Sequence, residues 1–161
     1  MKNYVIGVLI AGLLVLASLY YKELNRHPAR IFPTAESEAK PGVDIYLYFF
    51  FSKQSCHDCM QVVEVLNLLQ PPFSVTGVVP ENELKDETSL REITGVTFPL
   101  VSHVKYKHHL PLYSPTIVGT SRKGDIFFVL PGVPGTKEYI EDFLFGLYQK
   151  LTPYFMQKGN N

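Results

Sequence analysis

The stretch that most constrains the fold runs from Tyr46 to Cys59, where an aromatic segment passes into a short polar turn. The turn carries both cysteines of the chain. Residues 46–51 are all apolar or aromatic, as expected of a β-strand buried on both faces. After Cys59 the apolar residues recur at helical spacing until Pro71. The pattern predicts a buried strand, a loop and a helix that has Cys56 in its first turn.

The position of Cys56 suits a reactive thiol. Free backbone N–H groups and the positive end of the helix dipole stabilise a thiolate at a helix N-terminus. Cys59 follows three residues later, almost one helical turn away and within reach of a disulfide bond. Because C-x-x-C next to a βαβ pattern is a redox signature, the pair predicts thiol–disulfide exchange, with Cys56 as the nucleophile and Cys59 as the resolving cysteine.

Other uses of two cysteines at this spacing stay open, namely half of a zinc site or a structural disulfide. A zinc site would need two histidines, because the chain has no third cysteine. The candidates are His27, His57, His103, His108 and His109. The adjacent pair 108–109 lacks the spacing of a zinc finger, so we expect no metal and no other cofactor.

Composition excludes one class of partner. The 161 residues carry 15 Lys and Arg against 15 Asp and Glu, so the formal net charge is zero. No basic run exceeds two residues, and nucleic acid is therefore not an expected partner.

The N-terminal residues have the pattern of a membrane anchor. Tyr4 to Tyr21 is an uncharged apolar run just long enough to span a bilayer, and no strong cleavage site follows it. We expect residues 1–22 to be an uncleaved anchor, with a cleaved signal peptide as the alternative. Residues 23–42, with three prolines, are expected to be a flexible linker. The charges flanking the run do not decide orientation, but its signal-like position favours an extracytoplasmic domain.

One domain is expected over residues 43–152, followed by a C-terminal tail over 153–161. Strands are predicted near residues 44–51, 74–79, 98–101 and 126–130, together with a turn that leads into a further strand within 113–119, and a hairpin turn at 122–125. A helix over 81–93 should place Leu84, Leu90 and Ile93 inward and end at Gly95. A last helix should begin after Thr136, with Ile140, Phe143, Leu144, Leu147 and Leu151 on its apolar face. This order predicts an α/β fold with a central mixed β-sheet flanked by helices.

These motifs together resemble the membrane-anchored, thioredoxin-fold proteins of the TlpA/ResA type, which are extracytoplasmic thiol–disulfide oxidoreductases. The resemblance covers residues 44–151. It rests on the aromatic strand before Cys56-His57-Asp58-Cys59, on residues 95–101, on Ser114-Pro115-Thr116 and on the turn and strand at 122–126. It implies a thioredoxin-like fold, protein disulfide or dithiol substrates, and a membrane redox partner that recycles the cysteine pair.

The resemblance also implies a substrate groove. Pro115 corresponds to the cis-proline that faces the disulfide, with Ser114 and Thr116 beside it. A cis X–Pro bond would expose the backbone of Ser114 for β-type pairing with an extended substrate chain. His57 is expected to stabilise the Cys56 thiolate, whereas the negative charge of Asp58 opposes it and favours a reductant.

The sequence departs from the family at three places. Ser55 stands where the family usually has tryptophan, and Phe50 stands where many thioredoxins bury an acid. The acidic residue that the family often has shortly after the second cysteine would fall near Val62, and Glu64 is the nearest carboxylate beyond it. Proton transfer from Cys59 therefore lacks an obvious side-chain partner.

Three other functions remain as alternatives. A Cu(I) chaperone of this fold would bind metal through two thiolates and a histidine, although the cysteines of such proteins are usually further apart. A peroxidase of the peroxiredoxin kind is disfavoured by the short C-x-x-C and by the missing threonine before it. A non-catalytic, membrane-tethered binding module that uses the thioredoxin groove is the third alternative.

Overall fold

The computed structural model describes residues 41–55, 59–106, 115–132 and 136–158. Within these ranges, no helix combines the length and the apolar character needed to cross a membrane. The predicted anchor, residues 1–22, and most of the predicted linker lie outside them. The anchor therefore stays a prediction.

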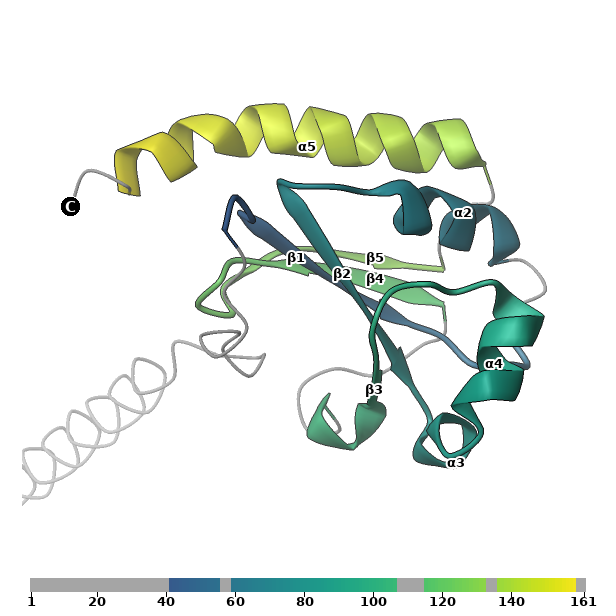
Figure 1. Ribbon diagram of the computed structural model, residues 1–161. Coiled ribbons are helices and arrows are strands. Elements are labelled where there is room, and N and C mark those ends of the chain that lie inside the picture. Colours follow the sequence, from purple (N-terminus) through teal and green to yellow (C-terminus); the bar gives the residue numbers. More distant parts are fainter. Residues whose placement is uncertain (1–40, 56–58, 107–114, 133–135, 159–161) are drawn as a thin grey trace, which may run out of the picture. The chain divides into compact units, whose positions relative to one another are not determined.

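A five-stranded mixed sheet forms the centre of the described chain, in the order β3-β2-β1-β4-β5 (Figure 1). β1 (Ile45–Phe50) is parallel to β2 (Phe73–Val79), and β2 is parallel to β3 (Leu100–Ser102). β4 (Thr116–Thr120) runs antiparallel to both β1 and β5 (Ile126–Pro131). The predicted α/β fold with a mixed sheet is confirmed, and so is the hairpin that joins the last two strands.

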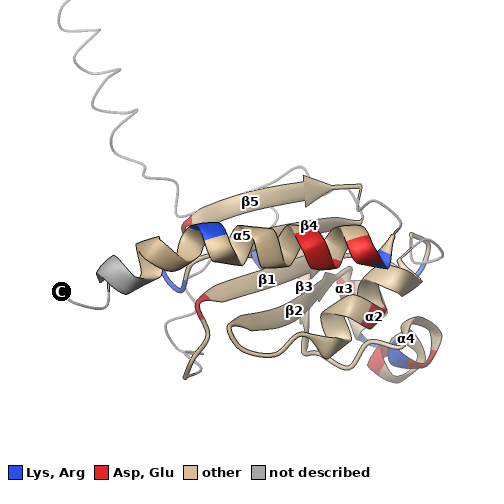
Figure 2. Ribbon diagram, turned by 90° about the horizontal axis from the view of Figure 1, so that it is seen from above, with Lys and Arg blue, Asp and Glu red and all other residues tan. Residues whose placement is uncertain are grey.

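The two longest helices among the described residues, α2 (Met60–Leu68) and α5 (Lys137–Lys158), lie side by side over one face of the sheet (Figure 1). Figure 2, seen from above, shows α5 along the sheet with acidic residues in its N-terminal half. Glu138, in the first turn, is favourable there because it lies at the positive end of the helix dipole. The C-terminal half carries Lys150 instead.

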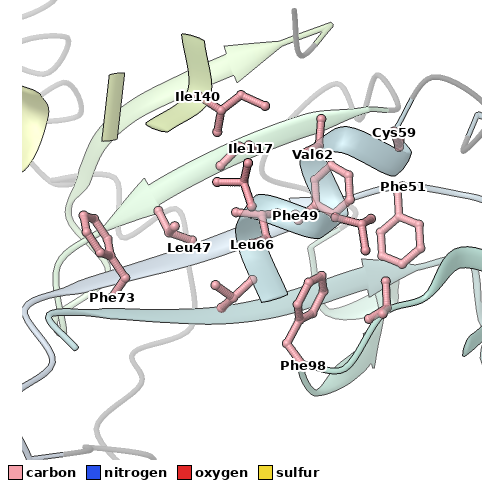
Figure 3. Close-up of a cluster of buried hydrophobic side chains, with 14 of the residues drawn as sticks. Leu47, Phe49, Phe51, Cys59, Val62, Leu66, Phe73, Phe98, Ile117 and Ile140 are labelled. Atoms are coloured by element: carbon pink, nitrogen blue, oxygen red, sulfur yellow. The ribbon is translucent and has the colours of Figure 1, made fainter. Parts of the chain in front are cut away.

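β1 is buried on both faces along its whole length, as its composition predicts. Since side chains alternate across a strand, Ile45, Leu47 and Phe49 contribute to the core under α2 and α5, with at most 2% of their surface exposed. This core also contains Phe51, Cys59, Val62, Leu66, Phe73, Phe98, Ile117 and Ile140 (Figure 3). Burying each large apolar side chain contributes roughly 1.5–3 kcal/mol relative to leaving it exposed.

The opposite face of β1 carries aromatic residues. Tyr46, Tyr48 and Phe50 form a second buried cluster with Val78, Tyr106 and Val118. Tyr106 lies on the short 3-10 helix η2 (His103–Tyr106), and its ring meets that of Phe50 edge to face at 5.6 Å. Both faces of the central strand are therefore closed by side chains.

A glycine allows the last two strands to pack closely. Gly119 on β4 lies opposite Phe128 on β5, and a Cβ at position 119 would overlap the Phe128 ring. The ring of Phe128 in turn packs edge to face against Phe143 of α5. The missing side chain thus makes room for an aromatic contact between the hairpin and the helix.

The segment predicted as one helix over 81–93 is two helices, α3 (Glu81–Leu84) and α4 (Glu87–Thr94), separated at Lys85–Asp86. Leu90 is fully buried and Leu84 packs against the core, as predicted. The prediction for Ile93 is wrong, because this side chain is 56% exposed. Thr94, four residues after Leu90, is the buried residue instead, and its hydroxyl donates to the Leu90 carbonyl at 2.7 Å. Gly95 ends α4 in the left-handed conformation, as predicted.

α5 begins where predicted and buries Ile140 and Leu144, but it extends further than expected. The helix continues through Pro153 to Lys158, into the segment assigned to the tail. Phe155 in this last part packs against the core and meets the Phe127 ring edge to face at 5.7 Å. This aromatic contact gives the additional turn of helix a packing partner.

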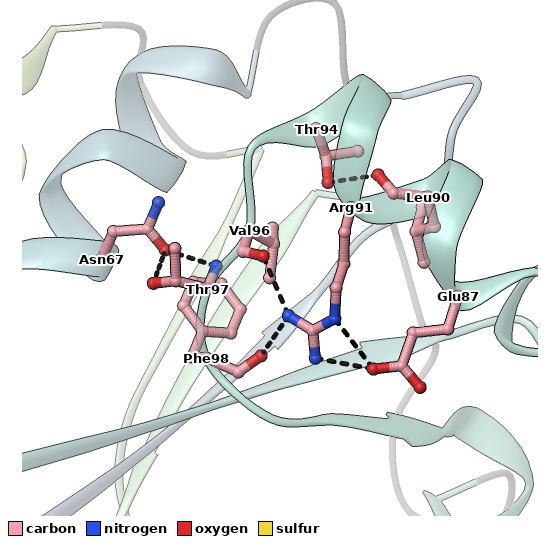
Figure 4. Close-up of polar contacts among 8 residues, drawn as sticks. All are labelled: Asn67, Glu87, Leu90, Arg91, Thr94, Val96, Thr97 and Phe98. Carbon is pink, nitrogen blue, oxygen red and sulfur yellow. Dashed lines mark hydrogen bonds and ion pairs between the residues drawn. The ribbon is translucent and has the colours of Figure 1, made fainter.

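Arg91 fastens α4 to the segment that leads into β3 (Figure 4). Its guanidinium donates to the carbonyl oxygens of Val96 and Phe98 at 2.9 and 3.1 Å, and it pairs with Glu87 at 2.7 Å. On the other side of this segment, Asn67 of α2 accepts from the Thr97 backbone at 2.9 Å and donates to the Gly95 carbonyl at 2.8 Å. Two side chains therefore hold residues 95–98 between α2 and α4.

We expect Arg91→Met, which keeps the apolar stem but removes the donors, to lower the free energy of unfolding by about 1.5–3 kcal/mol. The reason is that the Val96 and Phe98 carbonyls lose a charged donor. Denaturant unfolding measures the effect, with the neighbouring exposed residue changed in Glu92→Met as the control. Equal stability of the two variants would contradict this role.

Candidate functional site

The candidate site begins where β1 ends. Phe51 continues the apolar pattern for one more residue, and the chain then makes a turn over Ser52–Ser55. The backbone N–H of each serine lies within hydrogen-bond distance of the other hydroxyl, at 3.0 and 3.3 Å. The Ser55 N–H also lies 3.1 Å from the Ser52 carbonyl oxygen, which closes the turn. Two small polar side chains thus satisfy the backbone of a loop that leaves a buried strand.

Cys59 lies immediately before α2, as its N-cap residue. Its carbonyl oxygen accepts the first helical hydrogen bond, from Val63 N–H at 2.9 Å. The predicted helix is confirmed, and it begins at Met60. The prediction that Cys56 lies in the first turn of this helix is wrong, because α2 begins four residues after Cys56. Cys56, His57 and Asp58 lie outside the described residues.

The side chain of Cys59 is fully buried within the main apolar core, next to Phe51 and Val62 (Figure 3). Its Sγ donates to the backbone carbonyl oxygen of Ser55 at 3.1 Å. A thiol in such surroundings is shielded from large substrates. This burial agrees with the resolving role rather than with that of the attacking nucleophile.

Phe50 and Val62 stand at the two positions where thioredoxins of the family that the sequence resembles carry acidic residues, and both side chains are buried. Phe50 is 3% exposed on β1, and Val62 is fully buried on α2. Glu64, the nearest carboxylate beyond Val62, is exposed on the same helix. Two positions that could place an acid at the cysteines thus carry apolar side chains.

A carboxylate that the sequence did not indicate contacts the loop instead. Glu83 of α3 accepts the backbone N–H of Lys53 through Oε2 at 2.8 Å. The Lys53 ammonium donates to Ser89 Oγ at 3.2 Å and lies 3.5 Å from Asp86 Oδ2. No local pattern could have revealed these contacts, because 30 or more residues separate Lys53 from its partners.

The predicted groove residues reach the same end of the sheet. Thr116 is buried at the start of β4 and pairs with Phe50, the last residue of β1. Pro115 directly precedes it, and the Pro115 carbonyl accepts from Gly132 N–H at 2.9 Å. The antiparallel register thus brings Pro115 and Thr116 to the end of β1 from which the cysteine loop departs. Ser114 lies outside the described residues, so the cis state of the Ser114–Pro115 bond stays a prediction.

Among the described residues, no group of three His, Cys, Asp or Glu side chains is placed to hold a metal ion. Of the histidines considered for metal binding, His103 lies on η2, and the other four lie outside the described ranges. Of the groups that the copper alternative would use, Cys59 and His103 are described, whereas Cys56, His108 and His109 are not.

We expect Ser55→Ala to lower the free energy of unfolding by about 1 kcal/mol, because its hydroxyl is an acceptor for Ser52 N–H in a partly buried turn. Gln54→Ala, which changes the exposed residue of the same turn, is the matched control and should leave stability within about 0.5 kcal/mol of the wild type. Denaturant unfolding of both variants measures the difference. An unchanged stability of Ser55→Ala would show that the serine hydroxyls do not hold the turn.

No protein-family model matches the sequence, and no curated protein sequence matches it. Solved structures do match in fold. A Chlorobium tepidum protein described as a thiol:disulfide interchange protein DsbE aligns with a TM-score of 0.54 and 17% identity, covering 66% of this chain and 81% of that one. StoA from Bacillus subtilis aligns at 0.51 and 18% identity, covering 66% and 86%.

A third structure, a thiol:disulfide interchange protein of the thioredoxin family from Chlorobium tepidum, aligns at 0.50 with 15% identity. It covers 65% of this chain and 80% of that one. At these identities the likeness is one of fold. The chain has a thioredoxin-like α/β fold, with a mixed central sheet and flanking helices.

Proposed function

We propose that this chain is a thiol–disulfide oxidoreductase that exchanges disulfides with protein substrates through Cys56 and Cys59. The observation that carries the proposal is the position of Cys59. It is buried at the start of α2, directly beyond the loop that leaves the central strand of a thioredoxin-like sheet. The solved structures of similar fold include thiol:disulfide interchange proteins, which supports the same chemistry.

The exchange proceeds in two balanced steps. The Cys56 thiolate attacks one sulfur of a substrate disulfide, a mixed disulfide forms, and the other substrate sulfur leaves as a thiolate. Cys59 then loses its proton to water and attacks Cys56, which releases the second substrate thiolate. The substrate gains two electrons, and the cysteine pair ends as a disulfide. The reverse sequence oxidises a dithiol substrate.

The residues around the pair tune its chemistry and receive the substrate. His57 stabilises the Cys56 thiolate, whereas the negative charge of Asp58 destabilises it. A less stable thiolate makes the reduced pair a stronger reductant, so Asp58 favours reduction of the substrate. Pro115, with Ser114 and Thr116, forms the groove against which an extended substrate chain pairs. The place of Pro115 and Thr116 at the end of β1 supports this assignment.

The proposed setting is outside the cytoplasm, with residues 1–22 as a membrane anchor and residues 23–42 as a tether. A membrane redox partner would then return the cysteine pair to its starting state after each exchange. The apolar run from Tyr4 to Tyr21 supports the anchor.

The two cysteines should respond differently to substitution. We expect Cys56→Ser to abolish exchange with a protein disulfide and Cys59→Ser to accumulate mixed disulfides, because only the resolving attack is lost in the second variant. Non-reducing electrophoresis after alkylation separates the two outcomes. Trapping through Cys59 in the Cys56→Ser protein would reverse the roles. Biological activity that persists in full after loss of either cysteine, without disulfide exchange, would instead favour the non-catalytic binding module.

The anchor makes a separate prediction. The full-length protein should remain in the membrane fraction after a carbonate wash at high pH, since an apolar helix of this length resists extraction. Release of a shortened form into the soluble fraction would show that the segment is a cleaved signal peptide.

A further inference from the structure

The loop that precedes the cysteine pair is fastened to the α3–α4 segment through Lys53. The Lys53 backbone N–H donates to Glu83 Oε2 at 2.8 Å, and its ammonium donates to Ser89 Oγ at 3.2 Å. Asp86 adds an ion pair at 3.5 Å. Both α3 and α4 lie at the end of the sheet where β1 ends (Figure 1). One residue is thus held through its main chain and through its side chain.

Hydrogen bonds continue from this attachment to the sulfur of Cys59. Lys53 lies inside the turn that the paired serines, Ser52 and Ser55, close. The carbonyl oxygen of Ser55 then accepts from Cys59 Sγ at 3.1 Å. Every group in this path belongs to a described residue, and the path connects α3 to Cys59, the N-cap residue of α2. A shift of the turn would therefore move the acceptor away from the sulfur.

We propose that Glu83 is a positioning residue for the exchange reaction. By holding the Lys53 N–H, its carboxylate fixes the Ser52–Ser55 turn and keeps the Ser55 carbonyl at the sulfur of Cys59. This arrangement sets the equilibrium between the dithiol and the disulfide of the cysteine pair. The inference rests on the proposed exchange through Cys56 and Cys59.

The thiol hydrogen of Cys59 determines in which direction the loss of Glu83 shifts the dithiol–disulfide equilibrium. A Cys59 thiol has a hydrogen to donate to the Ser55 carbonyl, whereas a Cys59 sulfur in a disulfide has none. The contact therefore stabilises only the reduced form. When the pair reduces glutathione disulfide, two electrons and two thiol protons pass to glutathione, two molecules of reduced glutathione form, and this hydrogen bond is lost. Removing Glu83 should make the pair easier to oxidise.

A purely electrostatic role of Glu83 would act in the opposite direction. A carboxylate near the cysteines disfavours a thiolate, so removing its charge would stabilise the reduced pair and make it harder to oxidise. Glu83→Gln separates the two effects, because the amide oxygen can still accept from Lys53 N–H while the charge is gone. Glu83→Ala removes both the acceptor and the charge.

The test is the equilibrium of the full-length protein, in detergent, with reduced and oxidised glutathione, measured for the wild type and three variants. We expect Glu83→Ala to raise the equilibrium constant for oxidation about threefold, as the loss of one weak hydrogen bond allows. This corresponds to about 14 mV, since a tenfold change in this two-electron couple is about 29.6 mV. Glu83→Gln should stay close to the wild type. Glu81→Ala removes an exposed carboxylate from the same helix and is the matched control, with no change expected.

The outcomes distinguish a positioning role of Glu83 from a purely electrostatic one. An equal shift of Glu83→Ala and Glu83→Gln toward the reduced form would overturn positioning in favour of charge, and no shift in either would overturn any role for Glu83. If Glu83→Ala does not fold, Glu83→Asp shortens the reach to Lys53 and should show the same rise. Faster hydrogen exchange at the Lys53 amide is expected in whichever folded variant shows that rise. A wild-type pair that does not exchange with glutathione would refute the proposed function itself, which is a different result.

Discussion

The burial of β1 on both faces is the constraint on which the rest of the structure depends. A central strand with apolar side chains above and below needs two separate layers of partners, and the chain supplies them from different segments. α2 and α5 cover one face, and Tyr106 with its neighbours closes the other. Because the strand cannot shift by one residue without exchanging its two faces, its end point is fixed as well. The cysteine loop therefore leaves the sheet at one defined place.

The backbone groups of the loop over Ser52–Ser55 need hydrogen-bond partners of their own. The loop leaves a buried strand and enters a helix whose N-cap residue, Cys59, is buried, so its backbone groups need partners in little space. Ser52 and Ser55 satisfy part of this need locally, and Glu83 supplies a partner from a distant helix. Polar side chains at the edge of the core thus supply the hydrogen bonds to the loop backbone that neighbouring strands supply within a sheet.

The surroundings of Cys59 suggest how the proposed chemistry is tuned without the usual buried acid. The positions on β1 and α2 that carry acids in the similar family hold Phe50 and Val62, both buried. The polar group that meets the sulfur is a main-chain carbonyl, that of Ser55. A carbonyl accepts a hydrogen bond but does not take up a proton at neutral pH, so it can position the thiol without acting as its base. This agrees with water as the proton acceptor in the resolving step.

The sequence by itself determined the elements that depend on local pattern. The burial of β1 on both faces, the helix after Cys59, the left-handed Gly95 and the turn at residues 122–125 all follow from a few adjacent residues. Tertiary structure decided what depends on contacts between distant segments. Packing against the rest of the fold decides that α4 exposes Ile93 and buries Thr94, and Phe155 packs against the core in the part of α5 that continues past Pro153. The attachment of Glu83 to Lys53 is of the same kind, since its two partners are 30 residues apart and only the folded chain brings the carboxylate to the loop.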